Sequence, residues 1–329
     1  MSRKFLAIIC AMVFMGLVFT GTSFAAKRVV LGSAGQGGTW FVLGSGIANL
    51  VSKYNKDIKM TSSSTRGSIE NLRLVASKRI DIAMTQPPAD YWAVNGEELY
   101  KGKPLPDLRF ICGGHLSVQH TVVAADSPIK SLQDLKGKRV AIGVPGSGTR
   151  HICGRGVLWS AGLDFKDIDV ISLNQSQGAD ALVEGSADAA HFSGGLPNPG
   201  LMNLAMVKKV RILPITDADI ARLKKEHPYL SGAIKPVIIK AGTYKGQTKD
   251  VQTLGFITGF IGTKYTPDDI VYKFIKTIYD HRDELGKIHK AGYEYTLEAL
   301  ASGCDITPHP GAVKFFKEKG ITVTPKLGK

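Results

Sequence analysis

The chain has 329 residues, of which 43% are hydrophobic and 21% are charged. This length exceeds what one ordinary hydrophobic core supports, so we expect two domains. A formal net charge of +14 is typical of proteins that bind nucleic acid or lipid, but the lysines and arginines are scattered along the chain rather than massed on one helix. We therefore expect no nucleic-acid partner and no membrane-surface function.

The first 25 residues have the composition of an export signal. Arg3 and Lys4 form a basic start, residues 5–19 are apolar, and small residues follow for cleavage near Ala25 or Ala26. Loss of Arg3 and Lys4 lowers the formal charge from +14 to +12. No later stretch is long and apolar enough to predict a membrane span. We expect an exported protein in a bacterial periplasm.

A glycine-rich loop at residues 32–40 follows a β-branched run and precedes a segment with helical periodicity. Strand, glycine loop and helix start together expose backbone N–H groups to an anion. The spacing is close to that of a phosphate-binding P-loop, but Gly38 stands where the lysine would be, so we expect no nucleotide chemistry. A plain tight turn is the alternative interpretation. The candidate binding residues here are Gly37, Gly38, Thr39 and Trp40.

A second polar loop, at residues 62–68, is rich in hydroxyl groups and ends where a helix should begin. Arg66, Gly67 and Ser68 predict a carboxylate site there, with Arg66 as a forked donor. A capped surface helix with a solvated arginine fits the same residues. Residues 80–86 then predict a short buried strand that presents Gln86 to a cleft.

The second half of the chain repeats this plan. Residues 138–142 predict a strand, residues 143–149 a glycine loop and residues 150–160 a helix, while residues 182–190 echo residues 74–83. Two similar units, each with an anion-ready loop, argue for two lobes that face one cleft. The hydroxyl groups of the second loop should donate hydrogen bonds to a solute. Its candidate binding residues are Ser147, Gly148, Thr149 and Arg150.

Two long apolar runs suggest how the lobes are connected. Residues 108–125 and 251–261 predict strands that pass between the lobes, with helices at 268–279 and 295–301 after the second. We expect an α/β fold with the ligand cleft between two hinged lobes. Lobe I takes residues 26–120, lobe II takes residues 121–249, and residues 250–329 return to lobe I and form the C-terminal helices.

The sequence offers little for catalysis or metal binding. No serine lies in a Gly-x-Ser-x-Gly pattern, and three candidate bases have no evident acid or nucleophile partner: His115, His120 and His191. No Cys-x-x-Cys or His-Glu-x-x-His spacing occurs, so we expect no metal and no cofactor. Cys112, Cys153 and Cys304 remain after cleavage of the signal. They allow at most one disulfide, and buried thiols are the simpler interpretation.

Together these motifs resemble the TAXI family, the solute-binding receptors of TRAP transporters. The Gly-Gly-Thr-aromatic loop of that family matches residues 37–40, with Trp40 where tyrosine is usual, and its Gly-Ser-x-Glu-Asn-Leu element matches residues 67–72. Five later elements of the family also match: a strand at residues 134–140, the Pro-Gly-Ser-Gly-Thr loop at 145–149, the Asp-Ala strand at 188–189, the Gly-x-Pro turn at 195–197 and the closing signature at 309–320. Arg66 stands where the family commonly has a small residue, and His191 where an apolar one is common.

The resemblance implies a type II-like periplasmic-binding fold, no catalysis, and delivery of a small anionic solute to TRAP membrane subunits. We therefore predict a monomeric receptor for a dicarboxylate or an acidic amino acid such as glutamate. An enzyme on the same fold, such as a group transferase, and an adhesive surface protein are the alternatives. The complete set of predicted ligand-binding residues is Gly37, Gly38, Thr39, Trp40, Arg66, Gly67, Ser68, Gln86, Ser147, Gly148, Thr149, Arg150 and Pro197.

Overall fold

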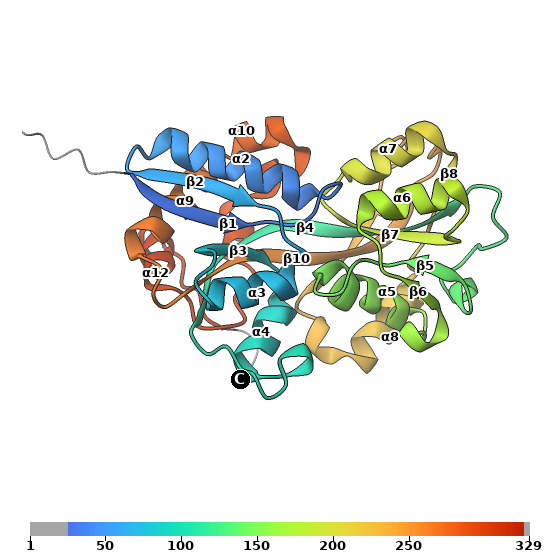
Figure 1. Ribbon diagram of the computed structural model, residues 1–329, viewed down its shortest axis with the longest axis horizontal. Helices are drawn as coiled ribbons and strands as arrows, with labels where there is room; N and C mark the ends of the chain where they lie inside the picture. The colour runs from blue at the N-terminus through green and yellow to red at the C-terminus, as the bar shows by residue number, and fades with distance from the viewer. Residues whose placement is uncertain (1–25, 326–329) are drawn as a thin grey trace, which may run out of the picture.

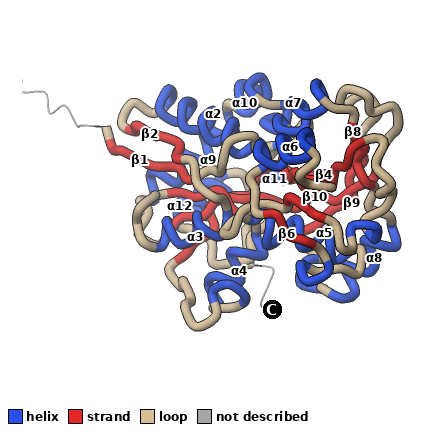
Figure 2. Tube along the Cα trace, turned by 45° about the vertical axis from the view of Figure 1, so that its right-hand side comes forward, coloured by secondary structure: helices blue, strands red, loops and turns tan. Residues whose placement is uncertain are grey.

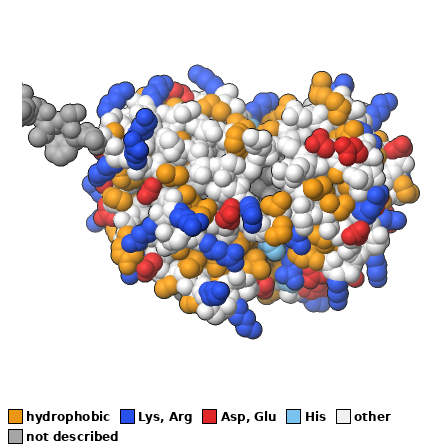
Figure 3. Space-filling view, in the orientation of Figure 1, with side chains coloured by type: hydrophobic (Ala, Val, Ile, Leu, Met, Phe, Trp, Pro, Cys, Tyr) orange, Lys and Arg blue, Asp and Glu red, His pale blue; other side chains and the backbone are white. Residues whose placement is uncertain are grey.

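A computed structural model of the protein describes residues 26–325 (Figure 1). The predicted export signal lies outside these residues. Within the described range, no helix is long and apolar enough to cross a membrane. Basic side chains are spread over the face shown in Figure 3 instead of forming one patch, as the scatter along the sequence predicts.

Ten strands of the described residues form one continuous mixed sheet. Along the sheet the strands follow the order β2-β1-β3-β10-β4-β7-β5-β6, while β8 pairs with β4 and β9 with β10. The strands are β1 (Lys27–Gly32), β2 (Ile58–Ser63), β3 (Ile82–Thr85), β4 (Leu108–Ala124), β5 (Arg139–Ala141), β6 (Asp169–Ile171), β7 (Ala189–Gly194), β8 (Val210–Leu213), β9 (Ile234–Ile239) and β10 (Val251–Thr263). Parallel pairs lie at both ends, and the antiparallel pair β4 and β10 lies in the middle.

The two long strands belong to both halves of the molecule, which confirms the prediction for residues 108–125 and 251–261. The C-terminal part of β10 pairs with β3, and its N-terminal part pairs with β9. Strand β4 pairs with β10 as far as Val118, then with β7 and β8. We call the side with β1, β2 and β3 lobe I, and the side with β5, β6, β7, β8 and β9 lobe II.

A β-bulge marks the point where the crossing strands change partners. Gly114 and His115 of β4 stand opposite the single residue Thr258 of β10. Because β10 leaves β9 at Phe256 and meets β3 at Gly259, the change falls at this bulge. The predicted lobe limits at residues 120 and 250 remain a prediction, and the strand pairing places the crossing slightly nearer the middle of each strand.

Helices cover both faces of the sheet, with α2, α10, α6 and α7 above it and α3, α4 and α8 below it in Figures 1 and 2. Lobe I carries α2 (Thr39–Tyr54), α3 (Ser68–Ala76), α4 (Pro87–Asn95), α9 (Asp268–Asp280), α10 (Arg282–Ile288), α11 (Leu297–Leu300) and α12 (Pro310–Glu318). Lobe II carries the π-helical turn η3 (Thr149–Gly154), which runs directly into α5 (Arg155–Ser160), then α6 (Gln175–Glu184), α7 (Pro199–Val207) and α8 (Asp217–Glu226). Short 3₁₀ turns, including η6 (Lys290–Glu294), join several of these elements.

The C-terminal helices return to lobe I, where α9 packs on α2 and α12. Helix α9 has a continuous apolar face with Ile270, Phe274 and Ile278 buried at four-residue spacing, which is why the sequence predicts it correctly. The helix predicted at residues 295–301 is shorter, because Thr296 caps α11 and the chain turns at Ala301. Helices α10 and α12 were not predicted from the sequence.

The hydrophobic core follows the crossing strands. A large cluster of buried side chains extends from α2 and α9 through Phe256 and Phe260 to Val157 and Leu158 of lobe II. A smaller cluster, which includes Leu182 and Phe192, lies under α6 and α7. The three cysteines of the described chain are buried, as predicted.

Candidate functional site

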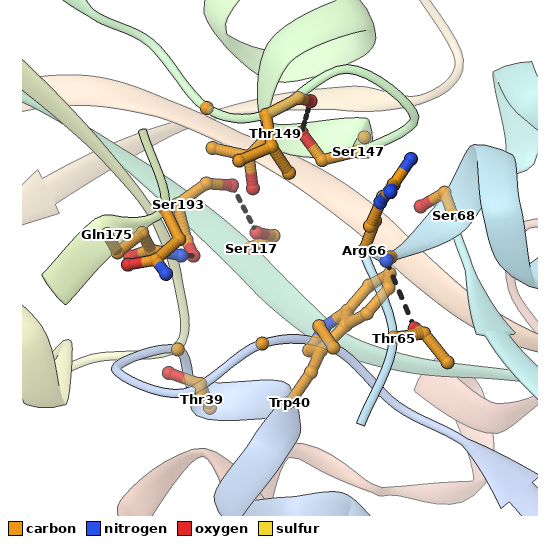
Figure 4. Close-up of a pocket in the computed structure, with 18 of the residues that line it drawn as sticks. Thr39, Trp40, Thr65, Arg66, Ser68, Ser117, Ser147, Thr149, Gln175 and Ser193 are labelled. Carbon is orange, nitrogen blue, oxygen red and sulfur yellow. Dashed lines mark hydrogen bonds between the residues drawn. The ribbon is translucent and has the colours of Figure 1, made fainter. Parts of the chain in front are cut away.

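A cavity of about 240 Å³ lies between the lobes, and Figure 4 shows it in close-up. Its walls come from loops of lobe I, loops of lobe II and the crossing strand β4. Ten of the thirteen predicted binding residues line it: Gly38, Thr39, Trp40, Arg66, Gly67, Ser68, Gln86, Ser147, Gly148 and Thr149. The lining residues that the sequence did not predict are Ala34, Gly35, Gln36, Thr65, Ser117, Gly143, Val144, Asn174, Gln175 and Ser193.

Three helix N-termini meet at this cavity, and two of them have no side-chain cap. Helices α2 and α3 begin after Gly38 and Gly67, which have no side chain to accept from the first-turn amides. At the helix η3–α5, which begins after Gly148, the Ser147 hydroxyl accepts from the Arg150 amide. Helix α6 differs, because the side chain of its N-cap Asn174 accepts from the Gln177 amide. Unpaired N–H groups and the positive ends of helix dipoles favour an anion.

Arg66 is the one charged side chain among the residues that line the cavity, and no aspartate or glutamate belongs to that lining. The guanidinium group is mostly exposed, and its Nε lies 3.9 Å from Oε1 of Glu70. In Figure 4 the side chain extends from lobe I toward the loop that holds Ser147. Arg66 therefore lies at the entrance of the cavity and not at its floor.

Gln86 reaches the cavity from the end of β3, as the sequence predicts, but its amide is already engaged. Its Nε2 donates to Sγ of Cys153 at 2.8 Å, and its Oε1 accepts from the Ser68 hydroxyl at 3.4 Å. Burial raises the pKa of the Cys153 thiol to about 11, so the sulfur stays protonated at neutral pH. This contact joins lobe I to lobe II behind the cavity wall.

The floor of the cavity carries a pair of buried hydroxyl groups. Oγ of Ser117, on β4, lies 2.8 Å from Oγ of Ser193, on β7. The amide of Gln175 lies next to them, because its Nε2 donates to the Ser193 carbonyl at 3.0 Å. The sequence did not predict Ser117, Ser193 or Gln175 as binding residues. For Gln175, the signal was the cap pattern Asn-Gln-Ser-Gln at a helix start.

Three predicted binding residues do not line the cavity. The Arg150 side chain turns away from the cavity. Its Nη1 donates to Oγ of Ser172 at 2.5 Å, and its guanidinium group lies over the ring of Phe165. Burial lowers the pKa of the Arg150 guanidinium. Gly37 and Pro197 form contacts between the lobes through their carbonyl groups. Gly37 accepts from the Gly200 amide at 3.1 Å, and Pro197 accepts from Nε2 of His289 at 2.9 Å.

The hydroxyl group of Ser147 is not available to a solute in this structure. It donates to the Val144 carbonyl at 2.8 Å and accepts from the Arg150 amide at 3.1 Å. Ser147 lines the cavity, but its expected role as a side-chain donor is wrong here, because a serine in such a tight loop closes its own turn. The Thr149 side chain, in contrast, points into the cavity toward Ser117 and Ser193 in Figure 4.

The three histidines considered as candidate bases are buried and neutral. Burial lowers the pKa of His191 and of His115 to about 3, and that of His120 to about 4. Nε2 of His191 lies 3.1 Å from Oε1 of Gln119, whose own Nε2 donates to the Ser117 carbonyl. His191 therefore supports the strand under the cavity floor from behind.

Hydrogen bonds between the lobes close the cavity on several sides. Oγ1 of Thr39 donates to the Gly195 carbonyl at 3.4 Å, and the Glu70 amide donates to the Gly146 carbonyl at 3.1 Å. The Gly37–Gly200 and Gln86–Cys153 contacts lie on other parts of the same boundary. The structure is thus a closed form of a two-lobed protein.

Two lobes joined by two crossing strands, with a cavity between them, define the periplasmic-binding-protein fold of type II. A solved structure described as a periplasmic transporter shares it, with a TM-score of 0.51, 17% identity and coverage of 90% of this chain and 93% of that one. The periplasmic aliphatic sulphonate binding protein SsuA of Escherichia coli overlaps with a TM-score of 0.48, at 18% identity, over 89% of this chain and 79% of its own.

The chain belongs to the NMT1-like family, whose model matches residues 31–320. A protein of Haemophilus influenzae named as a putative thiamine biosynthesis protein is 28% identical over 256 residues, which are 76% of this chain and 73% of the relative. The finer assignment to the TAXI receptors rests on the sequence motifs and stays a prediction.

Proposed function

We propose that the protein is a periplasmic receptor that binds a small organic anion in the interlobe cavity and delivers it to the membrane subunits of a transporter. One observation carries this proposal: two helix N-termini without side-chain caps, those of α2 and α3, meet the start of the helix η3–α5 at a cavity whose lining has one arginine and no acid. Each helix terminus stabilises a nearby anion by about 0.3–1 kcal/mol at a surface, and by up to about 2 kcal/mol in partly buried geometries.

The other lining groups fit an organic anion with a short carbon chain. The ring of Trp40 supplies an apolar surface, and the hydroxyl groups of Thr149 and the floor serines supply neutral hydrogen bonds. A cation would find no carboxylate in this lining, and burying an unpaired charge is costly. The site therefore favours carboxylates over amines.

The type of transporter is proposed from sequence motifs alone. The resemblance to TAXI receptors implies TRAP membrane subunits, which use an ion gradient. SsuA of Escherichia coli has a similar fold, so delivery to an ABC-type importer is the alternative. Uptake assays that compare collapse of the ion gradient with depletion of ATP separate the two, and uptake that depends on ATP alone would overturn the TRAP proposal.

Calorimetric titration of the purified protein tests the ligand class. We expect binding of small carboxylates, with glutarate and glutamate as probes, and no binding of ribose or thiamine. Thiamine belongs in the panel because of the name of the Haemophilus influenzae relative. Binding of ribose or thiamine without any carboxylate would overturn the proposal. A search for a chemical product after incubation with each probe addresses the group-transferase alternative.

A further inference from the structure

We propose that Gln175 forms, with Ser117 and Ser193, a second carboxylate-binding subsite, and that the solute is a diacid without an ammonium group. This inference rests on the proposed function, because it divides the same cavity into two ends and assigns a chemical group to each. It adds a specificity-determining residue that the sequence did not predict.

The hydrogen bonds of Gln175 fix the orientation of its amide. Oδ1 of Asn198 accepts from the Leu201 amide at 3.1 Å, so the Nδ2 of Asn198 must be the group that donates to Oε1 of Gln175, at 3.0 Å. The oxygen of Gln175 is thereby engaged, and its Nε2 faces the other way. One N–H of Nε2 donates to the Ser193 carbonyl at 3.0 Å, which leaves the second N–H for a ligand.

That second N–H lies where lobe II meets the start of helix α2. A Cβ atom built on Gly38 would lie 3.2 Å from Nε2 of Gln175, so the amide nitrogen and the first turn of α2 share one corner of the cavity. The hydroxyl groups of Ser117 and Ser193, which are 2% and 8% exposed, form the adjoining floor. This end of the cavity therefore offers several donors to one acceptor group.

The carbonyl oxygens of the two floor serines each accept a hydrogen bond from within the protein. The Ser193 carbonyl accepts from Gln175, and the Ser117 carbonyl accepts from Gln119. A carboxylate, which only accepts hydrogen bonds, is the group that such a set of donors matches. An ammonium group, which only donates, would find hydroxyl oxygens but no carboxylate in the lining.

The first carboxylate-binding subsite, formed by Arg66 and the start of helix α3, lies on the opposite side of the cavity. In Figure 4, Arg66 and Ser68 stand at one side, while Gln175 and Ser193 stand at the other, with Thr149 between them. The Arg66 guanidinium supplies donors on that side, and helix α3 begins there at Ser68 with no side-chain cap on its first-turn amides. Donor groups at both ends, together with a lining without acids, select a solute with a carboxylate at each end.

Calorimetry with three probes of equal chain length tests this division: glutarate with two carboxylates, pentanoate with one, and glutamate with two and an ammonium group. We expect the wild-type protein to bind glutarate at least tenfold more tightly than either of the others. The substitution Gln175→Leu should bring glutarate to the affinity of pentanoate and leave pentanoate itself nearly unchanged. Gln175→Glu, which replaces the donor with a negative charge, should weaken glutarate further.

Gln252→Leu is the matched control, because this half-buried amide of lobe II also bonds a backbone carbonyl and an acidic side chain but does not line the cavity. It should leave all three affinities unchanged. The inference is overturned if Gln175→Leu weakens glutarate and pentanoate equally, or if glutamate binds as tightly as glutarate. If the wild-type protein binds none of the three, the proposed function itself fails.

Discussion

A methyl group added at Gly148 should prevent the two lobes from closing fully. Gly148 has φ −66° and ψ −32°, a right-handed helical conformation that alanine adopts without strain. A Cβ atom built there would lie 2.1 Å from Oε1 of Gln86 and 2.6 Å from Oγ of Ser68. Both neighbours belong to lobe I, whereas Gly148 belongs to lobe II. The substitution Gly148→Ala should therefore disturb closure and leave each lobe intact.

The size of the effect follows from what must move. The Gln86 side chain cannot move away from the new methyl group without straining its buried hydrogen bond to Cys153. Such a bond contributes about 0.5–1.5 kcal/mol. Overpacking at a close contact adds about 1–3 kcal/mol. The closed form should lose roughly 2–4 kcal/mol in total, which corresponds to a fall in ligand affinity of about 30-fold to 1,000-fold.

Calorimetry with the best carboxylate from the panel measures this loss, and small-angle scattering reports whether the variant still closes. Gly232→Ala is the control, because a Cβ atom there meets no heavy atom within 4 Å. Both variants should unfold at the wild-type temperature without ligand if the ligand-free protein is open. Wild-type affinity and full closure in Gly148→Ala would refute the assignment of this contact to the closed interface.

Three further predictions concern the solute, the pH dependence and the hinge. Thr149→Val should weaken carboxylate binding by about 1–3 kcal/mol in calorimetry, because it leaves an anion oxygen unpaired; unchanged affinity would remove Thr149 from the site. Burial lowers the pKa of His191 from 6.5 to about 3, so the unfolded chain binds an extra proton below pH 6.5 and stability falls as pH drops. Denaturant titrations between pH 7 and pH 5 measure how the free energy of unfolding falls with pH. His191→Gln should make this fall smaller by up to about 1.4 kcal/mol per pH unit. Equal pH slopes in the wild-type protein and the variant would contradict the prediction. Addition of a tight carboxylate should reduce the radius of gyration in small-angle scattering if the two crossing strands hinge, and an unchanged radius at saturation would count against hinging.

The glycine loops were predictable because their chemistry is local. A strand, a run of glycines and a helix start place backbone amides at one point whatever the rest of the chain does, so Gly38, Gly67 and Gly148 were assigned to the cavity correctly. The repeat of this plan predicted the two lobes, and the long apolar runs predicted the crossing strands. Each of these features depends on neighbours in the sequence.

Side-chain direction was not predictable in the same way. Arg150 follows its loop as expected, but Ser172 and Phe165 draw the guanidinium group away from the cavity. Ser117 and Ser193 meet because β4 and β7 pair in one register, which no local pattern specifies. The orientation of Gln175 depends on the side-chain amide of Asn198, the N-cap residue of helix α7. These positions need the tertiary structure.

The sharing of β4 and β10 between the lobes also bears on how the chain folds. Gly255 pairs with Val118, so the central ladder joins segments that are far apart in the chain and enclose all of lobe II. Contacts of such high sequence separation slow folding, because the intervening loop must be closed before they form. Neither lobe has a complete sheet until β10 has been added. We therefore expect the pairing of β10 to complete the folding of both lobes. A chain that ends before residue 251 should stay incompletely folded.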